Sequence, residues 1–351
     1  MRAVRIALAF IGFAGGVAGC KVADPLYCDE NTPCLEAESR PFCDVNGEYP
    51  ASDGVENTCI PDPTGGPSDA GPGGPDGASD AGGTDGGLAR CSHETPFEDI
   101  ALLIGVNDER DQQNPWLSHD ERTMVFCDQD LGGQGELFIA TRSSPTGAFD
   151  PPAPIGGIES PDHEYRGQLS DDLETIYFDR NTVGGDYKLL VATRTSVAAE
   201  FSDISPIAGV NSGLDDYEPF VTEQGLYFGS NRDDVGDLYV APTTTSGFAE
   251  PVPLTAVNSS ADEEMPVPSA DGLALYFLAR DRGPDGAAVD VWVSTRADVD
   301  ADWGEPVRLG APINTDGNEY PGWLSDDSCR LYFTSDAGGD RDIWVATRSP
   351  E

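Results

Sequence analysis

Residues 323–348 read WLSDDSCRLYFTSDAGGDRDIWVATR, and this stretch decides the fold because the chain repeats it. A Leu-Ser-Asp-Asp turn leads into a short apolar strand, which is followed by a Gly/Asp-rich turn and a second strand that ends in Thr-Arg. Residues 168–194 repeat this order as QLSDDLETIYFDRNTVGGDYKLLVATR. Gly, Pro and Asp interrupt every apolar run, so the pattern predicts short strands and excludes helices.

Five copies of the pattern follow one another along the chain. The phenylalanines at the end of the first strand are Phe126, Phe178, Phe228, Phe277 and Phe333, and they lie 52, 50, 49 and 56 residues apart. Short strands at a period near 50 are typical of β-propeller blades. The strands hold consecutive apolar residues rather than alternating ones, which predicts that both of their faces are covered.

A fourth strand is expected between successive blades, and its pattern is clearest at residues 248–258, FAEPVPLTAVN. The last copy ends without it, but residues 97–107, FEDIALLIGVN, match that segment position for position. We expect this N-terminal strand to complete the fifth blade, which removes an exposed sheet edge. The predicted fold is therefore an all-β, five-bladed β-propeller closed by an N-terminal strand.

The repeat from Phe97 to Arg348 resembles the WD40-like "PD40" repeat of the TolB-like propeller group. Two copies depart from the pattern, since the third lacks two residues of its first turn and the first lacks the full acidic pair. The resemblance implies scaffolding and protein–protein contact in the bacterial envelope, and it implies no catalytic residues.

The N-terminus has the pattern of an export signal over residues 1–19. Arg2 and Arg5 precede a short apolar run and a stretch of small residues. Val17-Ala18-Gly19-Cys20 resembles a lipobox, which implies cleavage before Cys20 and a lipid on its sulfur. Lys21 follows, where an aspartate would suggest inner-membrane retention. We therefore expect an exported, membrane-anchored lipoprotein of the cell envelope, with the outer membrane favoured.

Two segments separate this anchor from the propeller. Residues 20–60 contain Cys28, Cys34, Cys43 and Cys59 but few large apolar side chains, which predicts a small module with two disulfides. Three pairings remain open, and a zinc site is disfavoured by the spacing and the lack of a nearby histidine. Residues 61–90 are almost entirely small or acidic and predict a disordered linker.

Three cysteines belong to the propeller segment, residues 91–351. Cys91 precedes the closing strand, and Cys329 lies in the first turn of the blade that this strand would complete. We expect both on the same face and predict a Cys91–Cys329 disulfide. Cys127 is then a buried free thiol.

The charge of the chain limits its partners. It has 63 acidic and 20 basic residues, for a formal net charge of −43. Such a negative chain disfavours nucleic acid and anionic membrane surfaces as partners. It fits cations, basic protein patches or uncharged glycans.

Acidic residues at the start of each blade, paired in the third and fourth blades, form the candidate ligand face on the propeller axis: Asp111, Glu164, Asp215, Asp216, Asp262, Glu263 and Glu319. Three interpretations remain open. The acids bind turn amides; or Asp215, Asp216, Asp262 and Glu263 hold Ca²⁺; or a carboxylate pair hydrolyses glycosidic bonds.

Other features favour structural roles. The recurring Thr-Arg predicts a structural ion pair, and Trp116 and Trp323 are expected in the core. No histidine spacing suggests zinc, and neither a nucleophile elbow nor a phosphate loop is present. We therefore predict an envelope binding or scaffold protein that contacts proteins or glycans and favour this over an enzyme. The alternative is a polysaccharide-acting glycoside hydrolase.

Overall fold

The computed structural model describes residues 90–129, 134–181, 185–282 and 289–350, together with the backbone of two short strands, β1 (Phe42–Cys43) and β2 (Cys59–Ile60). The chain divides into two units, residues 1–82 and 83–351. In the first unit β1 and β2 pair antiparallel, with Cys43 opposite Cys59. The predicted signal, the predicted lipidation at Cys20, the predicted disulfides of the cysteine module and residues 61–89 of the predicted linker lie outside the described residues.

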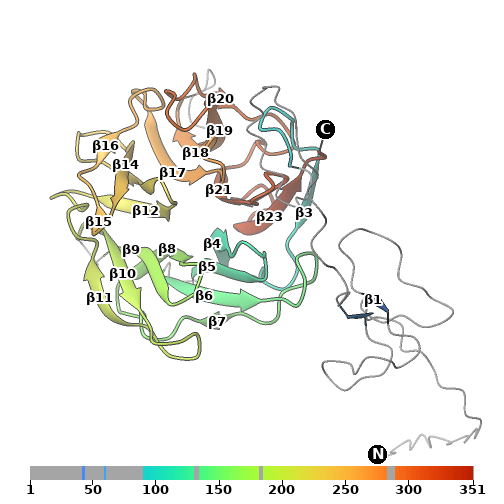
Figure 1. Cartoon of the computed structure of the whole chain (residues 1–351). Coiled ribbons are helices and arrows are strands. Elements are labelled where there is room, and N and C mark those ends of the chain that lie inside the picture. Colours follow the sequence, from blue (N-terminus) through green and yellow to red (C-terminus); the bar gives the residue numbers. More distant parts are fainter. Residues whose placement is uncertain are drawn as a thin grey trace, which may run out of the picture. The chain divides into compact units, whose positions relative to one another are not determined.

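The second unit is a five-bladed propeller, as predicted, and Figure 1 shows its sheets arranged in a ring. Blade 1 contains β4 (Asp111–Leu117), β5 (Thr123–Gln129), β6 (Gly135–Thr141) and β7 (Ala153–Pro154). Blade 2 contains β8 (His163–Leu169), β9 (Thr175–Asn181), β10 (Tyr187–Thr193) and β11 (Ser202–Pro206). Blade 3 contains β12 (Asp216–Val221), β13 (Gly225–Ser230), β14 (Asp237–Thr244), β15 (Gly247–Phe248) and β16 (Val252–Pro253).

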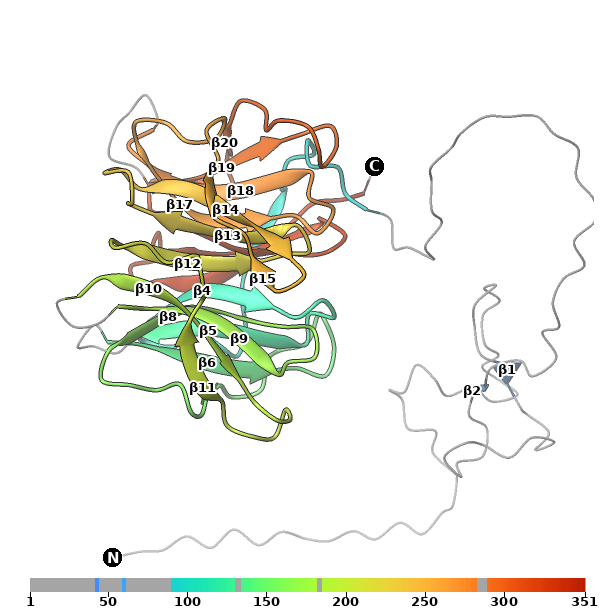
Figure 2. The same cartoon turned by 60° about the vertical axis from the view of Figure 1, so that its left-hand side comes forward.

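The two remaining blades follow the same antiparallel order. Blade 4 contains β17 (Asp262–Pro268), β18 (Ala274–Arg280), β19 (Val289–Thr295) and β20 (Val307–Arg308). Blade 5 contains β21 (Glu319–Leu324), β22 (Arg330–Ser335) and β23 (Asp342–Thr347), and its fourth strand is β3 (Asp99–Leu102). Figure 2 shows β12, β13 and β14 lying between the neighbouring blades, so neighbouring blades cover each other's faces. Among the described residues no helix is long and apolar enough to cross a membrane.

Strand β3 closes the ring, as predicted, by pairing with β23 in the register Leu102 to Trp344 through Asp99 to Thr347. The Asn107 side chain adds to this pairing. It donates to the carbonyl of Ile343 and accepts from the amide of the same residue, at 2.9 and 2.8 Å. Asn211, Asn258 and Asn314 make the same two bonds in blades 2, 3 and 4. The N-terminal segment therefore occupies the position of a fourth strand.

The recurring arginine after the third strand has a structural role, but the predicted ion pair is wrong for most blades. Its Nε donates to a backbone carbonyl of the first turn, and its guanidinium lies 4.2 to 4.5 Å from an aromatic ring centroid. The arginines are Arg142, Arg194, Arg296 and Arg348. Among these four arginines, Arg142 alone forms an ion pair within the described residues, with the Glu121 carboxylate at 3.7 Å. In blade 5 the ring is Phe97, from the closing segment.

These arginines also tie neighbouring blades together. Arg142 and Arg348 donate to the hydroxyls of Tyr332 and Tyr276 in the preceding blade, at 3.0 and 3.2 Å. Between blades 1 and 2 the tyrosine is replaced by Val125, and Nη2 of Arg194 has no hydrogen-bond partner within the described chain. A cavity of about 340 Å3 lies at this junction, lined in part by Trp116 and Leu173.

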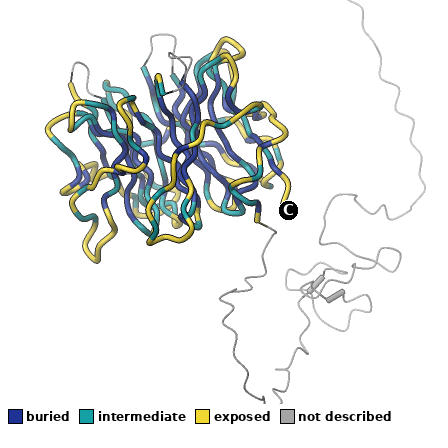
Figure 3. Tube along the Cα trace, turned by 90° about the horizontal axis from the view of Figure 1, so that it is seen from above, coloured by how far each residue is buried: buried dark blue, intermediate teal, exposed yellow. Residues whose placement is uncertain are grey.

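Burial follows the blade pattern, with the three inner strands of each blade mostly buried and the fourth strands and many loop residues exposed (Figure 3). Trp116 and Trp323 belong to the main core, as predicted. Cys127 is the free, buried cysteine of the described residues, and burial raises the pKa of its thiol. Cys91 and Cys329 form the predicted disulfide, with their Cα atoms 5.1 Å apart.

Removing the disulfide should weaken the closed ring. Because it joins residues 238 apart in the sequence, the Cys91→Ala/Cys329→Ala variant should lose about 3–5 kcal/mol of unfolding free energy. Urea denaturation with and without reductant measures this. Reductant should destabilise the wild type and leave the variant unchanged, and equal sensitivity of both proteins would contradict the role in closure.

Candidate functional site

The predicted ligand-face acids lie where the innermost strands begin, but their carboxylates already bind other groups of the propeller. Four of them take the same position in their blades and are at most 1% exposed: Glu164, Asp216, Glu263 and Glu319. Each accepts a hydrogen bond, at 2.5 to 2.9 Å, from a serine or threonine hydroxyl four residues earlier. The first three also form ion pairs with Arg180, Arg232 and Arg282. These acids fix the start of the innermost strand.

The other three predicted acids join neighbouring blades. Asp111, Asp215 and Asp262 accept hydrogen bonds from backbone amides of the preceding blade, at 3.0, 2.8 and 3.1 Å. His163 occupies the equivalent position in blade 2 and accepts from the amide of Gly135 at 3.3 Å.

The described side chains do not bring together three or more histidine, cysteine or acidic groups that could hold a metal ion. Calcium at Asp215, Asp216, Asp262 and Glu263 stays a prediction. The cation would have to displace the amide, hydroxyl and arginine partners given above.

A different set of residues lines the propeller axis, and a β-bulge places it there. Each innermost strand shifts register after its first few residues. At four of the five bulges a non-glycine residue has positive φ: Asn114, Arg166, Glu218 and Met265, at 58°, 36°, 60° and 54°. Such conformations cost roughly 1–3 kcal/mol each and gather at functional sites.

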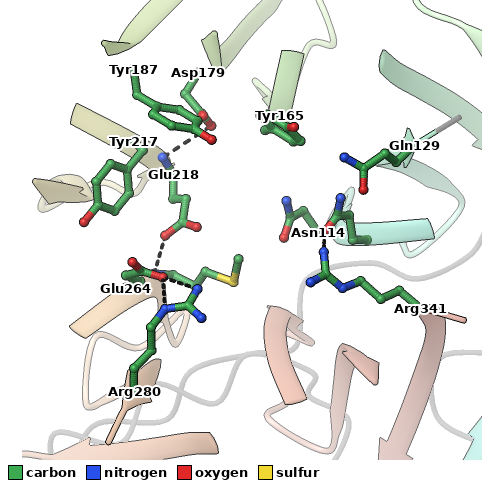
Figure 4. Close-up of a pocket in the computed structure, with 12 residues that line it drawn as sticks. Asn114, Gln129, Tyr165, Asp179, Tyr187, Tyr217, Glu218, Glu264, Arg280 and Arg341 are labelled. Carbon is green, nitrogen blue, oxygen red and sulfur yellow. Dashed lines mark hydrogen bonds and ion pairs between the residues drawn. The ribbon is translucent and has the colours of Figure 1, made fainter. Parts of the chain in front are cut away.

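The bulge residues and their neighbours line a cavity of about 260 Å3 to which all five blades contribute (Figure 4). Its lining residues are Gln113, Asn114, Gln129, Tyr165, Asp179, Tyr187, Tyr217, Glu218, Glu264, Met265, Arg280 and Arg341. The cavity lies on the face predicted to bear the acidic loops. We call it the axial pocket.

Three tyrosines form an aromatic arc on one side of the axial pocket. The ring centroids of Tyr165 and Tyr187 are 6.1 Å apart, and those of Tyr187 and Tyr217 are 5.9 Å apart. His163 stacks behind Tyr165 with an interplanar angle of 7°. The arc therefore offers apolar ring surface within an otherwise polar pocket.

Carboxyl groups gather beside this arc (Figure 4). Burial and the charge of Glu264 raise the pKa of Glu218 to about 8, although Arg166 opposes the shift. Burial likewise raises the pKa of Asp179 to about 7. The amide of Glu218 donates to Asp179 at 3.3 Å, and the amide of Met265 donates to the Glu218 carboxyl at 2.6 Å. The two carboxyls are therefore held in place by backbone groups.

Arg166 links three blades across the axis. Its terminal nitrogens donate to the carbonyls of Pro266, Pro321 and Gly322 at 3.2 to 3.3 Å. The side chain is fully buried, and this burial lowers its pKa. Arg166 is therefore an internal cation, committed to backbone carbonyls, whose charge acts on Asp179 and Glu218.

Two buried acceptors of the axial pocket have no hydrogen-bond partner among the described groups. They are Oδ2 of Asp179 and Oδ1 of Asn114, on side chains that are 1% and 5% exposed. Buried polar atoms are rarely left unsatisfied, because an unmade bond costs about 1–3 kcal/mol. The pocket thus presents acceptors to a ligand that donates.

Sequence reasoning missed this site because it followed the residues that recur between blades. The recurring acids, asparagines and arginines hold the blades together, whereas the axial pocket is built from positions that differ. The residues equivalent to Glu218 in the other blades are Asn114, Arg166, Met265 and Pro321. Variation between internal repeats at an inward-facing position was the signal available.

Comparisons with known proteins find only distant structural similarity. No protein-family model matches the sequence, and no curated protein is significantly similar to it. Similar structures include TolB from Acinetobacter baumannii, with 12% identity, a TM-score of 0.41 and coverage of 69% of this chain. This chain spans only 55% of the length of that TolB.

Glycoside hydrolases are also among the similar structures. A thermostable family-43 glycoside hydrolase has 13% identity and a TM-score of 0.49, with 72% of this chain and 98% of that chain covered. An α-L-arabinofuranosidase from Podospora anserina, in complex with cellotriose, has 14% identity and a TM-score of 0.45, with 73% and 98% covered. These likenesses concern the fold, and no residue role is transferred from them.

The buried carboxyls should make stability depend on pH. Because their folded pKa values are raised, their contribution to stability is present at low pH and is lost as the pH rises through about 7 to 8. Glu218→Gln should therefore gain about 1–3 kcal/mol over the wild type at high pH and little near pH 4. Urea denaturation across pH tests this, with the exposed Glu250→Gln as the control. Parallel curves for wild type and Glu218→Gln would contradict it.

Proposed function

We propose that the protein is a lipid-anchored envelope binding protein whose axial pocket holds one residue of a glycan. The observation that carries the proposal is the tyrosine arc facing buried carboxyl and amide groups within one pocket. Saccharides have apolar C–H faces and hydroxyl edges, so they are bound by ring surfaces together with a few placed polar groups.

The size of the pocket supports a single saccharide unit. Its volume of about 260 Å3 lies just below the range of roughly 300–1,000 Å3 usual for small-molecule sites. The pocket lies on the propeller axis at a loop face, so the rest of a glycan would extend outward. The unpartnered acceptors of Asp179 and Asn114 would receive hydroxyl donors.

The N-terminal sequence supports the location. The lipobox-like Val17-Ala18-Gly19-Cys20 would anchor the chain, and residues 61–90 would tether the propeller to the membrane. The PD40-like repeats fit a scaffold of this kind, as in the TolB-like group. The outer membrane is favoured by Lys21 after the lipid-bearing position.

Glycan binding should depend on the tyrosine arc. Tyr217→Ala removes ring surface from the axial pocket, so the affinity for a bound glycan should fall by about tenfold or more. Glycan arrays identify the ligand and isothermal titration measures the loss. Tyr177→Ala, outside the pocket, is the matched control and should bind like wild type. Absence of any glycan ligand, or equal binding by both variants, would overturn the proposal.

A glycoside hydrolase is the second candidate, and one observation favours it. Glu218 has a raised pKa, suited to a general acid, whereas the neighbouring Glu264 carboxylate pairs with Arg280 at 2.8 Å. A hydrolase would cleave nitrophenyl glycosides, and Glu218→Gln and Glu264→Gln would each lower kcat by at least about a hundredfold. Glycan binding without turnover in the wild type would exclude this candidate.

A further inference from the structure

We propose that the axial pocket selects a saccharide bearing a protonated amino group, which would lie between the Glu218 and Asp179 carboxyls and beside the tyrosine arc. This proposal rests on the glycan-binding function proposed above. Three independent features of the pocket support it: its charge balance, its unpartnered acceptors and its aromatic arc.

The charge balance on the Glu218 side of the pocket leaves room for one more cation, although Arg341 on the opposite wall makes the formal charge of the whole pocket neutral. Glu264 is neutralised by Arg280, whose Nε and Nη2 lie 3.1 and 2.8 Å from the same carboxylate oxygen. Asp179 and Glu218 share one internal cation, Arg166. When both carboxyls are ionised, they therefore exceed that cation by one charge.

Arg341 does not fill this place. It lies on the opposite wall of the pocket from Glu264 (Figure 4). There it donates to Oε1 of Gln113 at 2.9 Å and to the hydroxyl of Tyr320 at 3.2 Å. Its guanidinium also lies 4.9 Å from the Tyr320 ring centroid. The missing charge beside Glu218 must therefore come from a proton or from a ligand.

The unpartnered acceptors call for a group with several donors. Oδ2 of Asp179 and Oδ1 of Asn114 are buried, line the pocket and lack partners among the described residues. An ammonium group has three N–H donors and a full charge, so it suits the side of the pocket that holds Asp179 and Glu218. Asn114 lies across the pocket, on the side of Gln129 and Arg341 (Figure 4), and would accept from a hydroxyl of the same saccharide. A hydroxyl group would supply one donor and leave the charge unbalanced.

The aromatic arc favours the same occupant. Tyr187 lies between Tyr165 and Tyr217, so three rings border the space in front of the carboxyls (Figure 4). The face of a tyrosine ring attracts a cation, and more strongly when water is excluded. Rings beside carboxyls are thus suited to an ammonium group.

Binding of the amine should displace a proton. In the free protein Glu218 holds its proton at neutral pH, because burial and the charge of Glu264 raise its pKa. The charged groups that surround it are Asp179, Arg166, Glu264 and Arg280. A bound ammonium group stabilises the Glu218 carboxylate, so the proton leaves to solvent as the amine enters. Affinity should rise with pH as long as the amine stays charged.

The test is titration calorimetry of the full-length protein with glucosamine, glucose and N-acetylglucosamine at about pH 6.5, in two buffers of different ionisation enthalpy. We expect glucosamine to bind at least about tenfold more tightly than the two neutral sugars. Glucosamine alone should release protons, up to one each from Glu218 and Asp179, seen as a heat that depends on the buffer.

Glu218→Gln is the decisive variant. Glutamine resembles the protonated carboxyl and can accept the Met265 amide, so the fold should be retained. The variant should prefer glucosamine over glucose by a smaller factor than the wild type does and should release fewer protons, because only Asp179 remains to pair with the amine. Glu250→Gln, the charge-matched control, should behave as wild type. Equal binding of all three sugars by the wild type would overturn the amine preference and leave the glycan function standing. Absence of binding by every sugar and by glycan arrays would overturn both.

Discussion

The ring depends on the pairing of β3 with β23. Every other blade is built from consecutive strands, so it can form locally, whereas blade 5 needs a segment that precedes blade 1 in the sequence. Three further contacts hold this segment: Asn107 on the Ile343 backbone, Phe97 under Arg348, and the Cys91–Cys329 disulfide. Two of these repeat contacts found in other blades, and only the disulfide is special to the closure. The axial pocket needs a closed ring because residues of both the first and last blades line it.

Along each innermost strand, the residues that hold the blades together are different from the residues that line the axial pocket. The recurring acids bind serine or threonine hydroxyls, arginines or amides of the neighbouring blade. These contacts already engage their carboxylates. Two residues after the buried acid, or after Gln112 in blade 1, the strand has its bulge, and there the residue type changes from blade to blade. Asn114, Glu218 and Met265 therefore give the pocket walls of different chemistry. A five-fold scaffold can hold an asymmetric site because the residue at the bulge is left out of the regular strand pairing, so its type can differ between blades.

The sequence predicted the propeller, the closing strand, the Cys91–Cys329 disulfide and the buried thiol of Cys127. These predictions were possible because repetition and hydrophobic pattern report directly on strands and their order. The axial pocket was not predictable in the same way. The burial of Glu164 and Glu263 depends on arginines that arrive from the following hairpin, and the direction of the Glu218 side chain depends on a positive φ. A pattern of acidic residues does not show which group each carboxylate binds. It also does not show that the residue before a proline adopts a positive φ.

The junction between blades 1 and 2 lacks a hydrogen bond that other junctions have. Val125 leaves Arg194 without the tyrosine hydroxyl found at the junctions made by Arg142 and Arg348, and a cavity lies alongside. At the opposite face His163 takes the place of an acid at the connecting position. Local opening in proteins is easier where packing and hydrogen bonds are fewer, so this seam between blades 1 and 2 should open more readily than the junctions made by Arg142 and Arg348. Tyr165 lies on one side of the seam and Asn114 on the other, so this motion would widen the axial pocket and set how fast a ligand enters and leaves.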